Sequence, residues 1–359
     1  MKRFILTMFS LSLVIGIAVA AALWTLPTNN DVTVRIEVQR GDTLHRLSQQ
    51  WQQDGWLPSA LLLRVQAKLL QQDHVLRVGE YDVPPQLSGP QLLRHLQQAR
   101  PVAYSLTLIE GTTLRDALAV LAQTDGLQQD IEPLTPMAIA SLLELDGIAK
   151  ANPEGWLYPD TYIYHRGDRV SAIVQQSHQR MQRELNDAWQ HRQANLPYKT
   201  PYDVLIMASI IEKETGAPWE REEIAGVFVR RLQKNMRLQT DPTIIYGLGD
   251  EFKGNLRRRH LNDASNIYNS YRHHGLPPTP IALAGRAALQ AAVNPKDGDT
   301  LFFVARGDGT HVFSATLAEH NRAVRHYQIN QRRADYRSAP PSQPPPSPST
   351  ESVEGQSAP

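Results

Sequence analysis

The chain has 359 residues, enough for two or three domains of ordinary size. Its 37 Lys and Arg and 36 Asp and Glu leave a formal charge of +1, so no strong field attracts polyanions and we predict no nucleic-acid partner. Because the sequence contains no cysteine, disulfides, iron–sulfur clusters, thiolate zinc sites and cysteine nucleophiles are all excluded.

The N-terminal segment predicts a membrane span. Residues 4–26 carry no charged side chain and are long enough to cross about 30 Å of hydrocarbon as a helix. Basic residues precede this segment, so the positive-inside rule places residues 1–3 in the cytoplasm and the rest of the chain outside. We therefore expect a single-pass protein of the inner (plasma) membrane whose body is periplasmic or extracytoplasmic. A cleaved signal peptide is the alternative, because Ala18-Val19-Ala20 resembles a cleavage site.

The next segment predicts a small module of strands and helices. Residues 32–39 alternate apolar and polar side chains, which is typical of a half-buried strand, and a Gly41-Asp42 turn leads into a helix capped by Thr43. The apolar pattern then predicts further elements at 57–65 (helix), 78–83 (strand) and 92–98 (helix). The strand–turn–helix order recurs over 104–121 as a weak internal repeat.

Val38 to Leu44, with the sequence VQRGDTL, resembles the opening of a LysM domain. The resemblance implies a LysM-like module over residues 30–100 that binds N-acetylglucosamine polymers. A structural copy that has lost sugar binding is equally compatible with so short a match. Gly41 also has a simple structural explanation, because tight turns need a residue that tolerates positive φ.

Residues 101–195 are expected to form a linking α+β segment. It contains a helix over 136–145 and a long amphipathic helix over 170–190. Between them lies an aromatic segment that contains Trp156, Tyr158 and Tyr162. These side chains are expected either to line a sugar groove or, in the alternative, to pack in the core.

A helix over residues 202–216 carries the most specific chemistry. It is apolar on most of its circumference, so it is expected to be buried, with Gly216 as its C-cap. At about 100° per residue, Glu214 points into the most apolar sector, where a carboxyl has a raised pKa and can act as a general acid. Glu212 lies on the flank and is expected to support the site by pairing with a basic residue of the next segment. In the alternative, both are ordinary charges at an exposed helix end.

The remaining segments add a second helix over 220–232, polar and aromatic loops over 236–247 and 268–281, and a helix over 286–293. A hairpin over 301–313 and a final helix that contains His320 follow. Loops of this composition are typical of a saccharide cleft.

The motifs ASIIEKETG at residues 208–216, RLQTDPT at 237–243, YNSY at 268–271 and GLPP at 275–278 resemble those of the endolytic murein transglycosylase family, also called MltG or YceG-like. The resemblance implies a membrane-anchored α+β protein, with the LysM-like module followed by a mixed α+β catalytic domain over 196–335. It implies cleavage of the β-1,4 bond between N-acetylmuramic acid and N-acetylglucosamine inside nascent peptidoglycan strands, which leaves 1,6-anhydro ends. The family's acid falls on Glu214, and the implied partners are glycan strands and peptidoglycan synthases.

The candidates for holding the N-acetyl group and the sugar hydroxyls are Gln239, Thr240, Asp241, Thr243, Tyr246, Tyr268 and Asn269. Asp241 stands before a proline and is equally compatible with turn chemistry. Ser270 replaces the threonine common in the family and keeps its hydroxyl. No cofactor and no metal site are predicted, because the histidines show no ligand spacing.

Two other functions stay open at this point. One is a non-catalytic glycan-binding scaffold of the cell-wall synthesis machinery, in which Glu214 is only a charge. The other is an inverting muramidase, which would pair Glu214 with Asp241 or Glu212. The Pro- and Ser-rich residues 336–359 contain almost nothing apolar to bury and are expected to form a disordered tail.

Overall fold

The structure is a computed structural model that describes residues 2–72 and 77–330, with side chains from residue 8 onward. Contacts divide the chain into two compact units. Unit 1 holds the residues up to 108 together with 118–135 and 161–175, and unit 2 holds 109–117, 136–160 and the residues from 176 onward. The two units therefore interleave along the chain, and the predicted linking segment contributes to both. The predicted tail, residues 336–359, lies outside the described residues.

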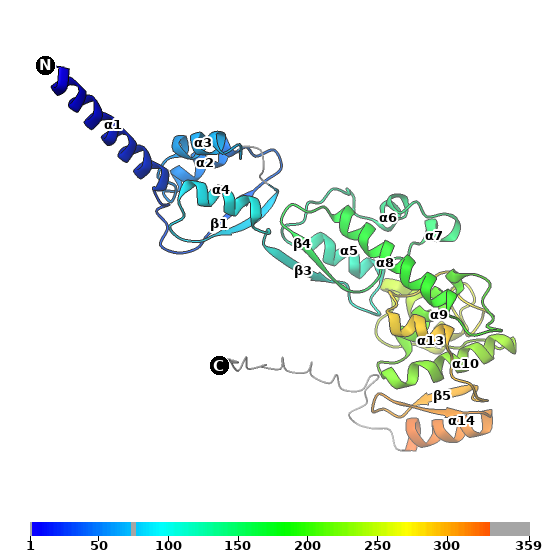
Figure 1. Ribbon diagram of the computed structural model, residues 1–359. Helices are drawn as coiled ribbons and strands as arrows, with labels where there is room; N and C mark the ends of the chain where they lie inside the picture. Colours follow the sequence, from blue (N-terminus) through cyan, green and yellow to red (C-terminus); the bar gives the residue numbers. More distant parts are fainter. Residues whose placement is uncertain (1, 73–76, 331–359) are drawn as a thin grey trace, which may run out of the picture. The chain divides into compact units, whose positions relative to one another are not determined.

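The architecture is mixed α+β (Figure 1). The helices are α1 Lys2–Thr25, α2 Leu44–Gln53, α3 Ala60–Leu69, α4 Gly89–Gln98, α5 Leu114–Gln123, α6 Pro136–Leu142, α7 Gly147–Ala151, α8 Val170–Gln190, α9 Pro201–Glu214, α10 Arg221–Gln233, α11 Asp241–Leu248, α12 Arg258–Asn262, α13 Arg286–Val293 and α14 Leu317–Val324. Short helical turns occupy Pro218–Glu220, Gly249–Glu251 and Arg325–Asn330. The strands are β1 Val34–Val38, β2 Gly79–Val83, β3 Ala103–Thr107, β4 Thr161–His165, β5 Phe302–Ala305 and β6 His311–Ser314.

The first module of unit 1 has the predicted order of elements. β1 pairs antiparallel with β2, and Ile36 stands opposite Tyr81 in the register. Gly41 has a φ of 91°, as the predicted turn requires, and the Thr43 side chain caps α2 by accepting a hydrogen bond from the Arg46 amide. The inward-facing side chains of β1, β2, α2, α3 and α4 form one hydrophobic core. The local sequence signals were therefore sufficient to predict this module.

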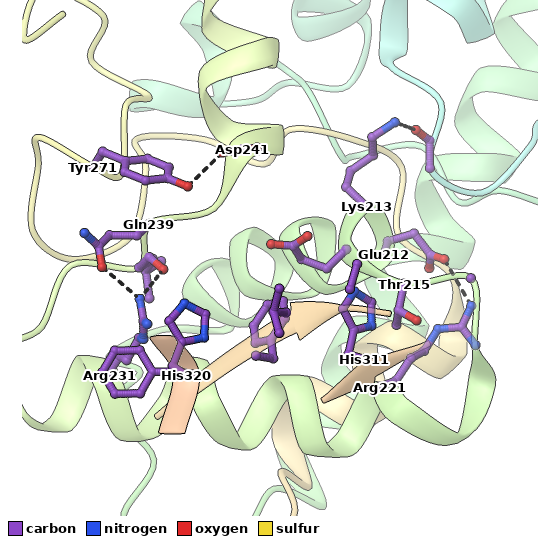
Figure 2. Close-up of a pocket in the computed structure, with 18 of the residues that line it drawn as sticks. Glu212, Lys213, Thr215, Arg221, Arg231, Gln239, Asp241, Tyr271, His311 and His320 are labelled. Atoms are coloured by element: carbon purple, nitrogen blue, oxygen red, sulfur yellow. Dashed lines mark hydrogen bonds and ion pairs between the residues drawn. The ribbon is translucent and has the colours of Figure 1, made fainter. Parts of the chain in front are cut away.

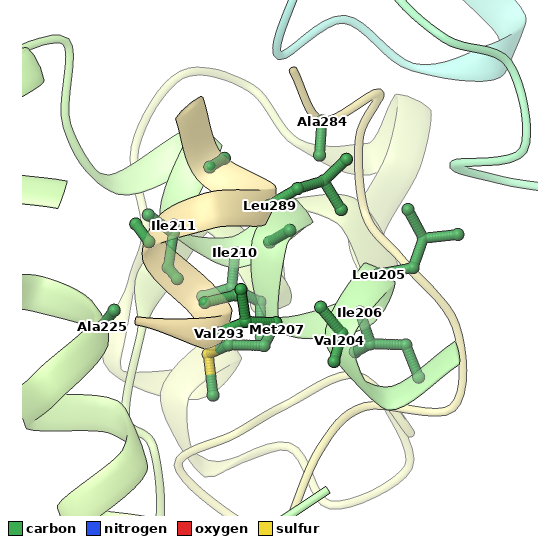
Figure 3. Packing of buried hydrophobic residues seen from close by; sticks show 14 of the residues in the cluster. Val204, Leu205, Ile206, Met207, Ile210, Ile211, Ala225, Ala284, Leu289 and Val293 are labelled. Atoms are coloured by element: carbon green, nitrogen blue, oxygen red, sulfur yellow. The ribbon is translucent and has the colours of Figure 1, made fainter. Parts of the chain in front are cut away.

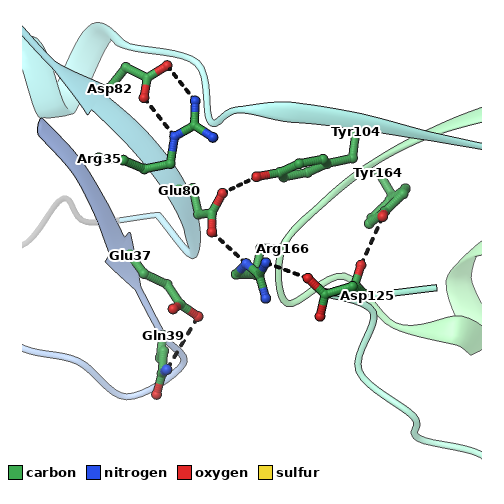
Figure 4. A network of polar contacts seen from close by, with 9 residues as sticks. All are labelled: Arg35, Glu37, Gln39, Glu80, Asp82, Tyr104, Asp125, Tyr164 and Arg166. Carbon is green, nitrogen blue, oxygen red and sulfur yellow. Dashed lines mark hydrogen bonds and ion pairs between the residues drawn. The ribbon is translucent and has the colours of Figure 1, made fainter. Parts of the chain in front are cut away.

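The second strand pair of unit 1 joins β3 to β4 in antiparallel register. Arg166, directly after β4, binds the Glu80 carboxylate of β2 at 2.6 Å and the Asp125 carboxylate at 2.8 Å (Figure 4). The Tyr104 hydroxyl donates to the same Glu80 carboxylate. One guanidinium thus links three separate segments of unit 1. The sequence analysis did not predict β4, because aromatic and turn-forming residues surround it.

The core of unit 2 is built around α9. Eight consecutive residues of this helix, from Val204 to Ile211, are buried, as its apolar circumference predicted. Leu289 and Val293 of α13 and Ala225 of α10 pack around it (Figure 3). At its N-terminus, Asp203 accepts hydrogen bonds from the amides of the residues just before the helix, which forms a capping box.

The end of α9 differs from the prediction. Gly216 was expected to be the C-cap of the helix, but the chain leaves the helix at Thr215, with φ −142° and ψ 136°. A β-branched residue favours this extended conformation, and the buried Thr215 hydroxyl accepts a hydrogen bond from the Ala217 amide. The prediction of a glycine C-cap was wrong, and the helix ends on Glu214 itself.

The aromatic segment before β4 divides between two environments. Tyr158 and Tyr162 are buried, so they take the core-packing alternative rather than a groove. Trp156 stacks on Tyr202 and lines a separate pocket of about 610 Å³ within unit 2.

Candidate active site

Unit 2 contains a pocket of about 1310 Å³ at the C-terminal end of α9 (Figure 2). Small-molecule pockets usually measure about 300–1,000 Å³, so this one has room for more than one sugar residue. Its walls come from residues 109–112, the end of α9, both ends of α10, the segment before α11, the loop that carries Tyr271, the β5–β6 hairpin and α14. The polar side chains that line it are Glu110, Thr112, Glu212, Lys213, Glu214, Thr215, Arg221, Arg231, Gln239, Asp241, Tyr271, His311 and His320.

Glu214 is the last residue of α9 and opens onto this pocket. Its Oε1 accepts a hydrogen bond of 2.6 Å from the Thr240 hydroxyl. Burial raises the pKa of Glu214 to about 7; the Thr240 hydrogen bond opposes that rise, the negative charge of Asp241 adds to it, and Arg231 opposes it. A carboxyl with this pKa is present in both its protonated and its ionised form near neutral pH, so it can donate a proton and later accept one.

Glu212 has a different environment from Glu214. Its side chain is only 5% exposed, Arg221 Nη2 lies 3.4 Å from Oε1, and Oε2 accepts a hydrogen bond of 3.0 Å from the Gly285 amide. The predicted pairing with a basic residue of the next segment is confirmed. Glu212 thereby holds the end of α9 to α10 and to the loop before α13.

A set of hydroxyl groups lies behind the Glu214 carboxyl. The Ser270 hydroxyl accepts a hydrogen bond from the Thr240 amide at 3.0 Å and lies 2.8 Å from the Thr243 hydroxyl. Thr243 in turn donates to the Thr240 carbonyl oxygen at 2.7 Å. These buried contacts hold Thr240 in the position from which it donates to Glu214. The serine at position 270 keeps the hydroxyl group on which this arrangement depends.

Asp241 and Gln239 also line the pocket. The Tyr271 hydroxyl donates to Asp241 Oδ1 at 2.8 Å, and Arg231 Nη1 donates to Gln239 Oε1 at 3.3 Å. Gln239 has a φ of 53°, which is unusual for a residue with a side chain. Its neighbouring carbonyl at Leu238 accepts a hydrogen bond of 2.8 Å from the same Arg231 nitrogen, which holds the backbone in place.

The model of the YceG-like family matches residues 36–326. The chain belongs to this family. An endolytic murein transglycosylase of Bacillus subtilis (strain 168) is 35% identical over 179 residues, which are 48% of this chain and 48% of that protein. One of Streptococcus pneumoniae serotype 2 (strain D39) is 27% identical over 337 residues, 84% of this chain and 60% of that one. The match thus spans about half to three fifths of these relatives' length.

A solved structure agrees with the family assignment. The 2.6 Å crystal structure of a YceG-like protein from Listeria monocytogenes is 28% identical to this chain and has a TM-score of 0.51. The match covers 82% of this chain and 99% of that one.

Five of the predicted substrate-binding residues of this YceG-like chain do not line the pocket: Thr240, whose hydroxyl is bonded to Glu214, and Thr243, Tyr246, Tyr268 and Asn269. Each of them is instead bonded within the fold. Asn269 is buried and its amide donates to the carbonyl oxygens of His260 and Asp263, at 3.0 and 2.7 Å. The hydroxyls of Tyr246 and Tyr268 both accept from Asn152, at 2.9 and 3.1 Å. These side chains support the loops around the pocket, because their polar atoms are occupied by protein groups.

The sequence analysis missed several polar residues of the YceG-like pocket. Arg231, Tyr271 and His311 come from a helix, a loop and a strand that lie far apart in the chain, and only folding brings them together. A buried arginine on an otherwise apolar helix face was the one available signal for Arg231. Glu110 falls within the strand–turn–helix repeat predicted over 104–121 and was not singled out, yet burial and the charge of Glu212 raise its pKa.

A raised pKa does not by itself mark a site in this YceG-like protein. Burial also raises the pKa of Glu154 to about 7. Its carboxylate accepts hydrogen bonds from the Leu114 amide at 2.8 Å and the Tyr246 hydroxyl at 3.2 Å, and it lines neither pocket described above. Glu154 is therefore a structural carboxyl, and Glu214 differs from it in opening onto a large pocket. Among the residues that the structure describes, no group of three or more His, Asp or Glu side chains is arranged to hold a metal ion.

Proposed function

We propose that this chain is an endolytic peptidoglycan lytic transglycosylase. It would cleave the β-1,4 bond between N-acetylmuramic acid and N-acetylglucosamine within nascent strands and leave 1,6-anhydro ends. The observation that carries the proposal is a single carboxyl, Glu214, with a pKa raised to about 7, at the edge of a pocket of about 1310 Å³. Membership of the YceG-like family and relatives named endolytic murein transglycosylase support the same activity.

Glu214 would act first as the acid and then as the base. Its protonated carboxyl donates a proton to the glycosidic oxygen while the bond from that oxygen to C1 of muramic acid breaks. The C6 hydroxyl of the same muramic residue then forms a bond to C1, and the Glu214 carboxylate takes the hydroxyl proton. One bond breaks, one forms, Glu214 ends as it began, and no water is consumed. Because the sugar supplies the nucleophile, this reaction needs no second carboxylate.

The other residues of the pocket would have supporting roles in this reaction. Thr240 is proposed as the positioning residue of Glu214, since its hydroxyl touches the carboxyl directly. Gln239 and Asp241 line the pocket and are proposed to contact the glycan. Glu212 is proposed to stabilise the end of α9, because both of its oxygens are occupied. Thr243, Tyr246, Tyr268 and Asn269 would act through the loops that they hold.

An inverting muramidase remains the second candidate, favoured by one observation. Asp241 lines the same pocket, and its charge contributes to the pKa of Glu214, so a second carboxylate is close by. An inverting enzyme would use it to activate water. The masses of the products separate the two reactions, because hydrolysis adds one water molecule per cleavage and transglycosylation adds none.

The test uses purified, uncrosslinked glycan strands with the wild-type protein and the variant Glu214→Gln. We expect wild-type products with anhydro ends and a rate in the variant lower by about 100-fold or more, the usual effect of removing a general acid. Glu251→Gln, an exposed residue outside the pocket, is the matched control and should keep wild-type activity. Unchanged turnover in folded Glu214→Gln would exclude Glu214 as the acid, whereas a wild-type protein that binds the strands without cleaving them would favour the glycan-binding scaffold.

The N-terminal helix is proposed to anchor the protein in the inner (plasma) membrane. The stretch Met8–Thr25 is long and apolar enough to cross a membrane, and none of it is buried within the protein. The basic residues at its start favour a cytoplasmic N-terminus and an extracytoplasmic catalytic domain. A peptidoglycan synthase is the partner that the family resemblance implies for an enzyme acting on nascent strands.

The first module of unit 1 is proposed to be LysM-like. Its strand–helix–helix–strand order, from β1 through α2 and α3 to β2, and its Gly41 turn support this assignment. The domain limits 30–100, 101–195 and 196–335 are part of the same proposal.

A further inference from the structure

His311 and Glu220 form a buried pair on the wall of the pocket, and the proposed reaction does not use them. Both side chains are 8% exposed. His311 Nδ1 lies 2.7 Å from Glu220 Oε2, and the His311 backbone amide donates to Oε1 at 2.9 Å. Glu220 ends the helical turn before α10, and His311 is the first residue of β6. One carboxylate therefore fixes both the backbone and the ring of the histidine.

Aromatic packing further restricts the ring of His311. Its plane lies at 88° to that of Phe303, with the ring centroids 5.4 Å apart. Phe303 itself packs edge to face against the core residue Phe228. Since the ring is bonded to Glu220 and packs at nearly a right angle to Phe303, it has little freedom to turn.

The second ring nitrogen of His311 is left for the pocket. His311 is one of the residues that line it (Figure 2), and within the described residues no protein group is hydrogen-bonded to its Nε2. A carboxylate on Nδ1 selects the tautomer whose proton is on that nitrogen, so Nε2 keeps its lone pair and can accept a hydrogen bond. A glycan strand in the pocket would offer hydroxyl groups that can donate this hydrogen bond.

The other charged groups of the pocket do not compete with Glu220 for the imidazole of His311. Besides the Glu220 carboxylate, the charged or titratable groups that α9, α10 and α14 contribute to the same pocket are Glu212, Lys213, Glu214, Arg221, Arg231 and His320. Arg221 is paired with Glu212, and Lys213 donates to the Gly111 carbonyl oxygen at 3.0 Å. The Glu220 carboxylate is therefore the group that is bonded to the His311 ring.

We infer that His311 contacts the substrate, that its Nε2 accepts a hydrogen bond from a hydroxyl of the glycan strand, and that Glu220 is its positioning residue. This rests on the proposed function, since it takes a glycan as the occupant of the pocket. It adds a binding contact from β6, on an element separate from the helix that carries Glu214.

Two substitutions separate the two nitrogens of the ring. His311→Asn keeps an amide near the position of Nδ1, where it can still bond Glu220, but leaves nothing at the position of Nε2. His311→Gln places its amide closer to the position of Nε2. His191→Asn, at an exposed position outside the pocket, is the matched control.

The experiment measures binding of soluble, uncrosslinked glycan strands to the Glu214→Gln protein with and without these second changes. We expect His311→Asn to weaken binding about fivefold to tenfold, as for one lost hydrogen bond, while circular dichroism shows that the variant is still folded. His311→Gln should lose less, and His191→Asn nothing. In active protein, His311→Asn should raise KM and leave kcat nearly unchanged.

A spectroscopic measurement keeps the outcome independent of catalysis. The ¹⁵N resonance of His311 Nε2 should move when strands are added, and Glu220→Gln should change the tautomer that the ring nitrogens report. Equal affinity of all variants, with an unmoved Nε2 resonance, overturns the inference even when Glu214→Gln is inactive. Conversely, an active Glu214→Gln protein would contradict the proposed reaction, while a shifted resonance would still support the His311 contact.

Discussion

A carboxyl group that must give a proton and then take one needs a pKa close to the pH at which it works. In this chain burial supplies most of that shift for Glu214, and the Thr240 hydroxyl limits it by stabilising the ionised form. Thr240 is in turn held by Ser270 and Thr243. The pKa of the proposed acid thus depends on one direct contact and on the hydroxyl groups behind it.

Replacing Thr240 by valine tests this dependence. In the wild type, the hydrogen bond from Thr240 lowers the pKa of Glu214. Valine cannot form this bond, so the pKa of Glu214 should rise further in the variant. The protonated acid would then persist to higher pH, so the decline in rate that the wild type shows as pH rises through about 7 should move upward. The rate at the optimum should fall about tenfold, because the carboxyl loses its positioning contact.

The measurement is the pH dependence of kcat on uncrosslinked strands. Thr107→Val, at a hydroxyl in unit 1 outside the pocket, should leave the profile in place. A Thr240→Val profile with the wild-type decline would show that Thr240 does not set the pKa of the acid.

At the scale of the element, α9 gives the pocket a rigid base. Its eight consecutive buried residues fill the centre of unit 2, and its first turn is held by a capping box. Burying one large aliphatic side chain contributes about 1.5–3 kcal/mol, so the position of the helix is strongly determined. The charged residues of its last turn are the part that reaches the pocket, which places Glu214 on a supported element rather than on a loop.

Ile210→Ala should therefore destabilise the protein strongly. Ile210 is fully buried, and such truncations cost about 2–5 kcal/mol because they leave a cavity. Ile267→Ala, the same change at a residue that is 61% exposed, should alter stability by less than about 0.5 kcal/mol. Urea unfolding followed by circular dichroism gives both values, and a similar effect of the two changes would contradict the central role of α9.

At the scale of the whole molecule, the apolar helix α1 is the element proposed to anchor the chain in a membrane. The eighteen residues from Met8 to Thr25 are unburied and apolar, and a helix of this length can cross a bilayer, where its apolar side chains are removed from water. The chain after it is tied to unit 1, since the Thr28 amide donates to the Leu87 carbonyl oxygen at 2.9 Å. Helix α1 and the first module are thus connected without a long linker.

Removal of residues 1–26 should convert the protein to a soluble form. We expect the full chain in the membrane fraction and the truncated chain in the soluble fraction, with activity on soluble strands retained because the pocket lies in unit 2. The mass of the full chain isolated from membranes provides the control. A mature chain that begins near residue 21 would show a cleaved signal peptide and contradict the anchor.

Helices and strands that depend on local sequence patterns could be predicted from the sequence. A long amphipathic helix such as α8 was predicted with its observed limits, and the apolar circumference of α9 showed that it is buried. Short elements whose partners lie far away in the chain, such as β4 and α11, were missed, although a Thr-Asp-Pro start signals a helix at α11.

Helical periodicity also singled out Glu214, because the direction of a side chain on a helix depends on neighbours within one or two turns. The neighbours that give the pocket its chemistry could not be predicted in this way. The contacts of Thr240 with Glu214 and of His311 with Glu220 join residues that are 26 or more positions apart. Asn269 holds its loop by bonding to backbone carbonyls, which have no sequence signature. Spacing along the chain does not encode such distances, since packing in three dimensions sets them.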